Sequence, residues 1–557
     1  MAPRVGRRNA QLRVLFAFAP FVACAWLYGP TLAGGLLSDD HSVLGVLYAW
    51  RDEGRLVAAL LAKFHSGLDV PSFYYRPLPM ATYGINFALA GADPFAWRLT
   101  NLVLHLASGG LVFAIALRLV DAPGATRAFA GPALAATIFL CFPTNVEAVA
   151  WVSGRYDLLA TLFMLATVAC FQRAQHWNDR WGMLSLLAAL CAFASKESAA
   201  VLPVFVLSMA AARAMRTDTR AALWRGARDA LPWILVAVAY FALRTAIFGT
   251  PLRVYPDTAP LAAFLRGDWL QTLATGGAWL GVVLPVPWAR VTFVASMGVL
   301  MAVSTAMCLP DARARGAWLA IAVTALASVG MVLPHLATLA ANGEEGRLFY
   351  STSALIALLL ALTWSVPPRA GHWSALPSFG GVLMVLMLVA QAVLLRAAVA
   401  PWTDAGEQAT ALVRALPGLA RTIPENGYGL VLVADHLGAV PFGRNAQGGL
   451  ISPPTQAAPL SARLVVQTPD ELAAWPSHIS RGLVDALRRY PLAQVWPAVE
   501  DGRASVPIAP SDYFCWDSSR RMLVPLQLPA NVASGEWIGA WRAALTASPC
   551  RELARDL

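Results

Sequence analysis

The sequence predicts a multi-spanning α-helical membrane protein that ends in a small soluble α/β domain. Of its 557 residues, 58% are hydrophobic and only 13% are charged, whereas soluble proteins carry about 25% charged residues. Long apolar runs fill residues 1–399, and residues 400–557 are more polar and carry short strand-like segments. We therefore expect a transmembrane domain over 1–399 and a soluble domain over 400–557.

The transmembrane prediction is based on apolar runs close to the length of a membrane crossing. A helix needs about 20 predominantly apolar residues to span the hydrocarbon core. The twelve candidate runs are 13–32, 101–120, 128–143, 156–172, 181–195, 198–215, 230–248, 268–287, 291–309, 316–334, 348–365 and 378–398.

Arginines set the expected orientation, because short cytoplasmic loops carry an excess of basic residues. Arg4 and Arg8 place the N-terminus in the cytoplasm, and a cluster between Arg213 and Arg228 marks a cytoplasmic loop. The net charge of +10 is distributed over such loops, so we interpret it as an orientation signal and expect no nucleic-acid partner.

The number of crossings depends on the run at 268–287. If all twelve runs crossed, Arg313 and Arg315 would lie outside, against the charge rule. The 268–287 run is interrupted by polar residues and glycines and ends in Pro-Val-Pro, which favours an interfacial or re-entrant segment. We expect about eleven crossings, with the C-terminal domain in the periplasm. The alternative is twelve crossings with a cytoplasmic C-terminal domain.

Two regions are expected outside the membrane, a first external loop at about 33–98 and the soluble domain. An apolar patch at 79–91 in the loop is too short to span and predicts an amphipathic helix at the membrane surface. In the soluble domain, the segments 427–435 and 462–467 predict strands. The segment 522–528 is a weaker strand candidate because it contains a proline, and 470–490 predicts a short helix.

The cysteines and aromatic residues of the C-terminal region suggest structural roles. Cys515 and Cys550 lie in this polar region, and a disulfide between them is plausible if the domain is exported. Four aromatic residues could stack on a sugar, Trp475, Trp496, Tyr513 and Trp516, but scattered tryptophans are more often part of the core.

Ionisable residues gather on the expected outer side of the membrane, where Asp39 and Asp40 directly follow the first helix. Arg155, Lys196 and Arg347 stand at the ends of later helices, and charges near the membrane usually mark a functional site. A free carboxylate suits a general base, and cations suit a phosphate leaving group. Supporting roles are expected for Arg76, His105, Glu147, Asp157, Glu197 and Glu345.

Structural roles are the alternative for several of these residues. Asp39 and Asp40 could simply cap a following helix or keep the loop hydrated. Lys196 with Glu197, and Arg155 with Asp157, could form ion pairs that hold helix ends together. Glu147 could accept a hydrogen bond from a buried backbone amide.

Histidines near these positions raise two further alternatives. Asn101 and His105 stand one helical turn apart, a spacing more typical of helix packing than of a ligand site. Asp39, Asp40 and His41 are adjacent, which is not the ligand spacing of a helical or hairpin metal site. No metal site is assigned, and a divalent metal is the one cofactor left open.

Five motifs occur in order along residues 30–360, and together they resemble a known family. They are Asp39-Asp40; Tyr75–Leu78 leading to Leu102–His105; Thr144–Val149 with Gly154–Leu159; Ser195–Glu197; and Glu345–Tyr350. In this order they resemble the membrane O-mannosyltransferases that carry tetratricopeptide repeats, and their bacterial relatives. Those proteins belong to the GT-C class of polyprenyl-phosphate-sugar glycosyltransferases, which also includes the protein O-mannosyltransferases.

The resemblance implies a GT-C-like helix bundle with a long first external loop. It also implies a lipid-phosphate-linked sugar as donor, inversion at the anomeric carbon and an acidic residue of the loop as base. By position that base is Asp39 or Asp40, and Asp40 is favoured. In this chain residues 400–557 stand where the family has its repeats.

These observations predict an inner-membrane glycosyltransferase that moves one sugar from a polyprenyl-phosphate carrier to an acceptor hydroxyl on the periplasmic face. Its expected partners are the lipid-linked sugar, membrane lipid, and an acceptor that is a protein or a cell-envelope glycan. The alternatives are a flippase or transporter of lipid-linked sugars, an oligosaccharide ligase that uses a diphosphate carrier, and a non-catalytic partner that binds glycan.

Overall fold

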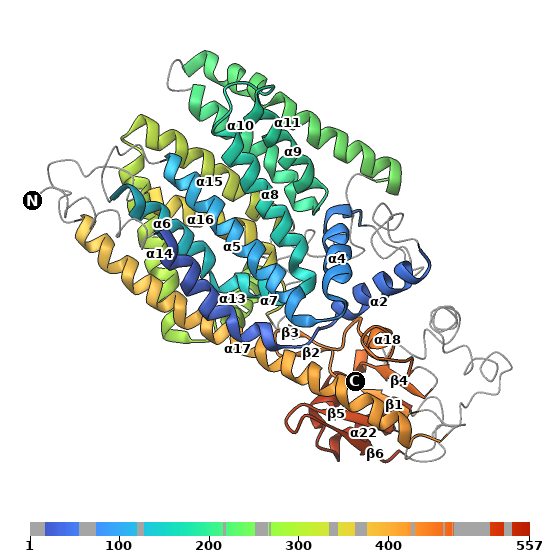
Figure 1. Ribbon diagram of the computed structural model, residues 1–557. Coiled ribbons are helices and arrows are strands. Elements are labelled where there is room, and N and C mark those ends of the chain that lie inside the picture. The colour runs from blue at the N-terminus through green and yellow to red at the C-terminus, as the bar shows by residue number, and fades with distance from the viewer. Residues whose placement is uncertain are drawn as a thin grey trace, which may run out of the picture. The chain divides into compact units, whose positions relative to one another are not determined.

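The computed structural model separates into two compact units, which we describe one at a time (Figure 1). The first unit comprises 1–30, 75–79 and 98–400, and the second comprises 31–74, 80–97 and 401–557. The residues that the structure describes are 17–54, 74–119, 127–214, 219–250, 266, 269–332, 343–362, 376–424, 429–460, 463–470, 472, 513–528 and 537–557. The domain boundary expected near residue 400 remains a prediction.

The chain is a multi-spanning α-helical membrane protein, as predicted. Within the described ranges, six helices are long and apolar enough to cross a membrane: Pro94–Leu119, Val152–Phe171, Gly226–Phe248, Pro287–Cys308, Ala314–Val332 and Gly380–Thr422. A seventh crossing results if Ala130–Leu140 and Pro143–Ala150, bent by 50°, form one span. Shorter apolar helices cover Ala17–Ala33, Arg180–Phe193 and Gly346–Leu362. The total of about eleven crossings stays a prediction.

Most helices belong to the first unit. They are α6 (Arg127–Leu140), η3 (Pro143–Asn145), α7 (Val146–Ala150), η4 (Val152–Gly154), α8 (Arg155–Phe171), α9 (Arg180–Phe193), η5 (Glu197–Val201), α10 (Leu202–Ala214), α11 (Thr219–Phe248), α13 (Trp269–Val283), α14 (Pro287–Cys308), α15 (Ala312–Val332), η7 (Gly346–Phe349) and α16 (Tyr350–Leu362). Helices α4 (Pro77–Ala90), α5 (Pro94–Leu119) and α17 (Leu376–Thr422) contribute residues to both units.

The helix α13 occupies the run that the sequence marked as the weakest crossing. Its 15 residues reach only about 22 Å at 1.5 Å per residue, which is less than the roughly 30 Å of the hydrocarbon core. It ends at Val283, before the prolines at 285 and 287.

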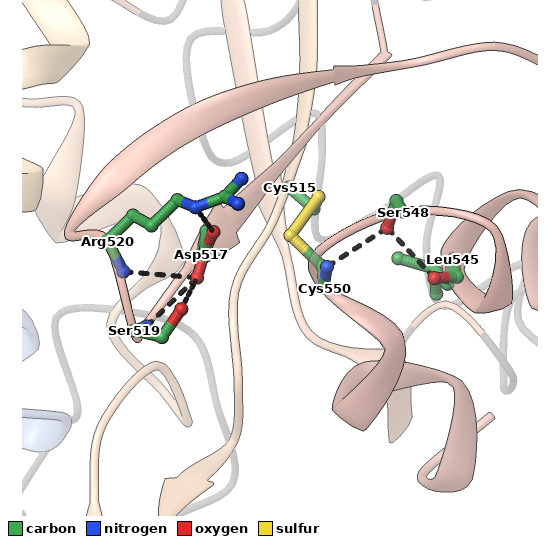
Figure 2. Close-up of a disulfide and its surroundings, with 7 residues drawn as sticks. All are labelled: Cys515, Asp517, Ser519, Arg520, Leu545, Ser548 and Cys550. Carbon is green, nitrogen blue, oxygen red and sulfur yellow. Dashed lines mark hydrogen bonds and ion pairs between the residues drawn. A yellow bond between two sulfur atoms is a disulfide. The ribbon is translucent and has the colours of Figure 1, made fainter.

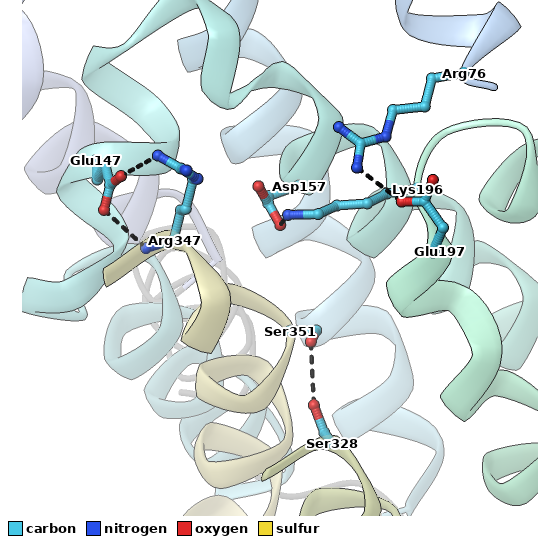
Figure 3. Close-up of polar contacts among 8 residues, drawn as sticks. All are labelled: Arg76, Glu147, Asp157, Lys196, Glu197, Ser328, Arg347 and Ser351. Atoms are coloured by element: carbon cyan, nitrogen blue, oxygen red, sulfur yellow. Dashed lines mark hydrogen bonds and ion pairs between the residues drawn. The ribbon is translucent and has the colours of Figure 1, made fainter. Parts of the chain in front are cut away.

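Small and hydroxyl-bearing residues bring the helices of the first unit close together. A Cβ on Gly226 of α11 would lie 2.9 Å from the backbone nitrogen of Ala211 in α10, so only glycine permits this approach. Ser328 of α15 contacts the Ser351 hydroxyl of α16 at 3.2 Å (Figure 3). Such contacts are typical of helix packing in membranes, where burial alone does not drive association.

The second unit is built on a four-stranded sheet with the order β4-β1-β5-β6. Its strands are β1 (Gly429–Leu432), β4 (Leu464–Gln467), β5 (Tyr513–Asp517) and β6 (Met522–Leu526). Strand β1 pairs in parallel with β4 and β5, and β6 runs antiparallel to β5. The other elements are η1 (Gly29–Ala33, which straddles the boundary), α2 (Asp39–Asp52), the hairpin β2 (His436–Leu437) and β3 (Val440–Pro441), α18 (Gln447–Leu450), α22 (Trp537–Thr546) and η9 (Arg551–Arg555).

The predicted strands are confirmed. The segments 427–435 and 462–467 contain β1 and β4, and 522–528 contains β6. The proline that weakened the third prediction is accommodated because β6 is an edge strand. A helix at 79–91 is confirmed as α4, and its position at the membrane surface stays a prediction. The helix predicted at 470–490 lies almost entirely outside the described residues.

A disulfide closes the core of the second unit, as the sequence suggested. Cys515 of β5 is bonded to Cys550, which directly precedes η9 (Figure 2). Both cysteines are buried in a cluster that includes Trp541 and Leu545 of α22. Tyr513 packs edge-on against Trp541, with ring centroids 5.4 Å apart, and Trp516 is buried, so the core alternative is confirmed for these two. Trp475 and Trp496 lie outside the described residues.

Removing this disulfide should destabilise the second unit. The bond joins residues 35 positions apart, and loop-closure entropy predicts a loss of about 3 to 4 kcal/mol in unfolding free energy. We expect Cys515→Ser, Cys550→Ser and the double variant to lower the thermal unfolding midpoint equally. Cys170→Ser, which removes a free cysteine, is the control. Rapid alkylation of both thiols in unreduced wild type would contradict the bond.

Candidate functional site

The predicted acidic pair begins helix α2 in the second unit. Asp39 and Asp40 lie in the first turn, where a carboxylate interacts favourably with the helix dipole. Asp40 is buried, and its Oδ2 accepts a hydrogen bond from the backbone nitrogen of Leu37 at 3.1 Å. Asp39 is half-buried, and its Oδ1 accepts from Asn445 Nδ2 at 2.7 Å. The two carboxylates therefore differ in exposure and in hydrogen bonding.

His41, the next residue, has a packing role. Its Nε2 donates to the Leu36 carbonyl at 3.1 Å, and its Nδ1 accepts from the Thr455 hydroxyl at 3.1 Å. Burial lowers the pKa of His41 to about 4, against the raising effect of the Leu36 bond, so the ring is neutral at pH 7. Both ring nitrogens are used, and among the described residues no group of three or more His, Cys, Asp or Glu could hold a metal ion.

In the first unit, Arg347 of η7 is held by Glu147 of α7. The guanidinium pairs with Glu147 Oε1, and Glu147 Oε2 accepts from the backbone nitrogen of Arg347 at 3.2 Å (Figure 3). A Cβ on Gly346 would lie 3.0 Å from the Thr144 carbonyl oxygen. A glycine at 346 thus lets η7 approach η3 closely enough for both contacts. The Arg347 guanidinium also lies over the Trp151 ring, 4.8 Å from its centroid.

Lys196 pairs with Asp157 of α8, with 2.5 Å between Nζ and Oδ1 (Figure 3). The alternative pairs, Lys196 with Glu197 and Arg155 with Asp157, are wrong. Lys196 has extended backbone angles (φ −161°, ψ 151°), so successive side chains point to opposite sides. Arg155 and Asp157 are two positions apart on a helix, a spacing that does not bring side chains together.

Glu197 lies between two arginines. Its Oε2 accepts from Arg76 at 2.7 Å and its Oε1 from Arg244 at 3.0 Å. Burial alone raises the pKa of Glu197, but Arg76 and then Arg244 hold it below its ordinary value. The sequence analysis missed Arg244, although an arginine inside the apolar run 230–248 is a signal of this kind.

Arg155 and His105 are fully buried among structural partners. Arg155 Nε donates to Asn101 Oδ1 at 2.8 Å, and Asn101 Nδ2 donates to the Trp151 carbonyl. His105 Nδ1 accepts from the Tyr350 hydroxyl at 2.7 Å, and its Nε2 donates to the Leu140 carbonyl at 3.0 Å. These bonds join the interior of α5 to the ends of neighbouring helices, which is the helix-packing alternative considered for Asn101 and His105.

Glu345 completes a group of charges that we call the acid–base cluster, which comprises Glu147, Asp157, Lys196, Glu344, Glu345 and Arg347. Burial raises the pKa of Glu345 to about 7; the charge of Arg347 opposes this, and a smaller effect of Lys196 also lowers it. Glu344 carboxylate oxygen lies 3.9 Å from Arg347 Nη1. Both cations thus act on one carboxyl group within one cluster.

The two cations of this cluster have donors to spare. Within the described residues, the Lys196 ammonium bonds only to Asp157, and the Arg347 guanidinium reaches its carboxylates through Nη1. An ammonium has three N–H donors and a guanidinium five. The remaining donors could bind an anionic oxygen, such as that of a phosphate.

Comparison with known proteins confirms the resemblance inferred from the motifs. The chain is 31% identical over 127 residues to protein O-mannosyl-transferase Tmtc1 of Drosophila melanogaster and 32% identical over 131 residues to TMTC2 of Homo sapiens. Each match covers 22% of this chain and 14 or 15% of the relative. Drosophila Tmtc3 is 29% identical over 190 residues, 31% of this chain and 20% of its own length. The chain thus matches a fifth or less of these relatives. No family model matches.

Among solved structures, the crystal structure of ArnT from Cupriavidus metallidurans bound to undecaprenyl phosphate aligns with 86% of this chain and 92% of its own. Its TM-score is 0.42 and its sequence identity is 13%.

The pair between Glu147 and Arg347 should be a strong determinant of stability. Their side chains are 5% and 21% exposed, and removing one partner of a buried pair costs about 3 to 5 kcal/mol. We expect Arg347→Met to lower unfolding free energy by this amount and the double variant Glu147→Gln/Arg347→Met to recover part of it. The control pair Arg521 with Glu407, 41% and 48% exposed, should contribute about 1 kcal/mol or less. Equal losses for both pairs would refute the prediction.

Glu345 should make stability fall as the pH rises. Because its pKa is raised from 4.5 to about 7, the folded state binds a proton that the unfolded state has released between these values. The resulting contribution to the free energy of unfolding is fully present below pH 4.5 and is lost as the pH rises through 7. We expect wild type to lose of the order of 3 kcal/mol relative to Glu345→Gln over this range, measured by thermal unfolding. Parallel pH profiles would exclude the raised pKa.

Proposed function

We propose that this protein is a glycosyltransferase that moves one sugar from a polyprenyl-phosphate carrier to an acceptor hydroxyl on the periplasmic face of the inner membrane. A carboxylate of the acidic pair accepts the proton of the acceptor hydroxyl, and the oxygen attacks the anomeric carbon. The bond between that carbon and the phosphate oxygen breaks with inversion, and polyprenyl phosphate leaves with the electron pair. The acceptor is a protein or a cell-envelope glycan.

The observation that carries the proposal is the match to several proteins that are named protein O-mannosyl-transferases. This match makes mannose the first donor sugar to test. The multi-spanning helical fold provides the setting that a lipid-linked donor needs. The disulfide between Cys515 and Cys550 supports a periplasmic location of the second unit, because disulfides persist in oxidising compartments.

The geometry of the acid–base cluster supports the proposal that its two cations bind the departing phosphate. Lys196 and Arg347 are fixed by carboxylates and keep unused donors, so they can neutralise a departing phosphate without losing their own support. A phosphate needs no protonation to leave, and fixed positive groups stabilise the charge that develops on it. Arg155, which also bonds to Asn101, has the further task of holding helix ends.

The hydrogen bonds of Asp39 and Asp40 support the proposal that one of them is the general base. The hydrogen bonds of Asp39 to described residues go to Oδ1, which leaves Oδ2 for an acceptor hydroxyl. Asp40, favoured by the sequence, is more deeply buried and interacts with the backbone of Leu37. We therefore propose that the pair works together, with Asp39 or Asp40 taking the proton and the other carboxylate stabilising the start of α2.

The first test is transfer of radiolabelled mannose from a synthetic polyprenyl monophosphate carrier in membranes that contain the protein. Wild type should transfer sugar, and Asp39→Asn or Asp40→Asn should reduce the rate about 10²- to 10⁴-fold, the usual contribution of a general base. Asp52→Asn removes an exposed carboxylate from the other end of α2 and should keep full activity.

The same assay separates the alternatives. Activity that needs a diphosphate carrier would favour the oligosaccharide ligase. If wild type is inactive with every donor while it moves lipid-linked sugar across vesicles, the flippase replaces the transferase. Full activity of the Asp39→Asn/Asp40→Asn double variant would refute the role of the acidic pair.

A further inference from the structure

The second unit contains a cavity at the carboxyl edge of its parallel strands. The chain passes from β1 to β4 on one side and then returns to β5 on the other side of β1. At the carboxyl edge, the connections that leave β1 and β5 therefore lead to opposite sides, towards β4 and β6. In sheets of this kind ligands bind where the strand order reverses. The cavity has a volume of about 410 Å³ and is lined by His436, which follows β1, and by Ser518, which follows β5. It lies at this switch point.

The size and lining of this cavity suit a small polar ligand. Small-molecule pockets in proteins usually measure about 300 to 1,000 Å³. The polar lining includes Asp404 and Gln408 of α17, and Glu552 and Asp556 near the C-terminus. Leu437 and Leu553 add apolar surface. Carboxylates and an imidazole can accept hydrogen bonds, and the leucines can contact carbon-bound hydrogens.

The charge of the lining disfavours an anionic ligand. Three carboxylates, those of Asp404, Glu552 and Asp556, line the cavity with one guanidinium, that of Arg555. Asp404 is paired with Arg521 at 2.7 Å and also accepts from Gln408 Nε2 at 2.8 Å. Glu552 and Asp556 remain in excess over Arg555, so a phosphate or carboxylate ligand would be repelled.

The aromatic residue that lines the cavity, Trp516, holds a polar side chain in place and is too buried to stack on a sugar ring. Trp516 is only 1% exposed, and its indole nitrogen donates to Gln408 Oε1 at 3.2 Å. Gln408 thus joins Trp516 to Asp404 and fixes the position of that carboxylate. Recognition in this cavity would rest on hydrogen bonds to carboxylates, with little contribution from a sugar ring stacked on tryptophan.

We propose that this cavity is a saccharide-binding site for neutral or amine-bearing sugars. The hydroxyl groups of such a sugar donate to the carboxylates of Glu552, Asp556 and Asp404, and its carbon-bound hydrogens contact Leu437 and Leu553. The site belongs to the second unit alone and does not depend on the transfer activity proposed above, so the binding test below can fail or succeed independently of the transfer assay.

Binding should be measured with the full-length protein in lipid nanodiscs, because maltoside detergents carry a sugar headgroup that would compete. The probes are methyl α-D-mannopyranoside, D-glucosamine and mannose 6-phosphate. Their binding is measured by saturation-transfer difference NMR and by calorimetry. We expect methyl α-D-mannopyranoside, D-glucosamine or both to bind saturably. Mannose 6-phosphate should bind at least tenfold more weakly.

Two variants test the location of the site. Ser518→Trp should fill the cavity, and Glu552→Gln/Asp556→Asn should remove exposed acceptors with little effect on folding; each should weaken binding at least tenfold. Asp52→Asn removes an exposed carboxylate elsewhere in the same unit and should bind like wild type, and unfolding midpoints check that all variants fold. The proposal is overturned if no probe binds saturably, if mannose 6-phosphate binds as well as the neutral sugar, or if binding survives both cavity variants.

Discussion

The cost of placing charge among apolar helices governs the structure of the first unit. A buried ion without a polar partner is too expensive to keep, so the charges near the helix ends are met by groups brought from elsewhere in the sequence, in several cases by an opposite charge. Glu147 receives Arg347 from 200 positions away, and Asp157 receives Lys196 from 39 positions away. The first pair joins α7 to η7, and the second joins α8 to the start of η5. The apolar faces of the helices provide packing, and the ion pairs fix which helix ends meet.

This constraint also gives local sequence features a physical reason. Glu345 adopts a left-handed conformation, with φ of +81°, and Gly346 follows where a side chain would approach the Thr144 carbonyl. Together they turn η7 so that both the backbone and the side chain of Arg347 reach Glu147. The cluster that results contains two cations with unused donors beside a carboxyl group that titrates near pH 7. It is a suitable place for an anionic group to bind and leave.

The second unit depends on a different constraint, which is holding a small sheet together. β1 pairs on both sides, and the disulfide ties β5 to the C-terminal segment. The start of α2 is bound to this unit as well, because Ser38 nitrogen donates to Phe442 and Ser38 Oγ donates to the Arg444 carbonyl. A Cβ on Gly449 of α18 would lie 2.7 Å from His41, so α18 can pack directly on α2. The acidic pair therefore lies on a helix that is packed against the rest of the second unit, and not on an unsupported loop.

The sequence by itself determined the membrane class, most helix positions and three of the four sheet strands, because composition and periodicity are local properties. It also singled out Lys196, Arg347, Glu147 and Asp157, since a charge is conspicuous in an apolar run. It did not predict β5, whose segment Tyr513–Asp517 shows no clear strand signal, and it offered the helix α2 only as the alternative in which Asp39 and Asp40 cap a following helix.

Only the tertiary structure decided which charges pair. Sequence neighbours such as Lys196 and Glu197 were the natural candidates, yet Lys196 bonds to Asp157, and Glu197 bonds to Arg76 and Arg244. Backbone direction sends adjacent side chains to opposite sides, and helix packing brings together residues that are far apart in the chain. Pairing is thus a property of three-dimensional distance, which residue type and spacing along one sequence do not specify.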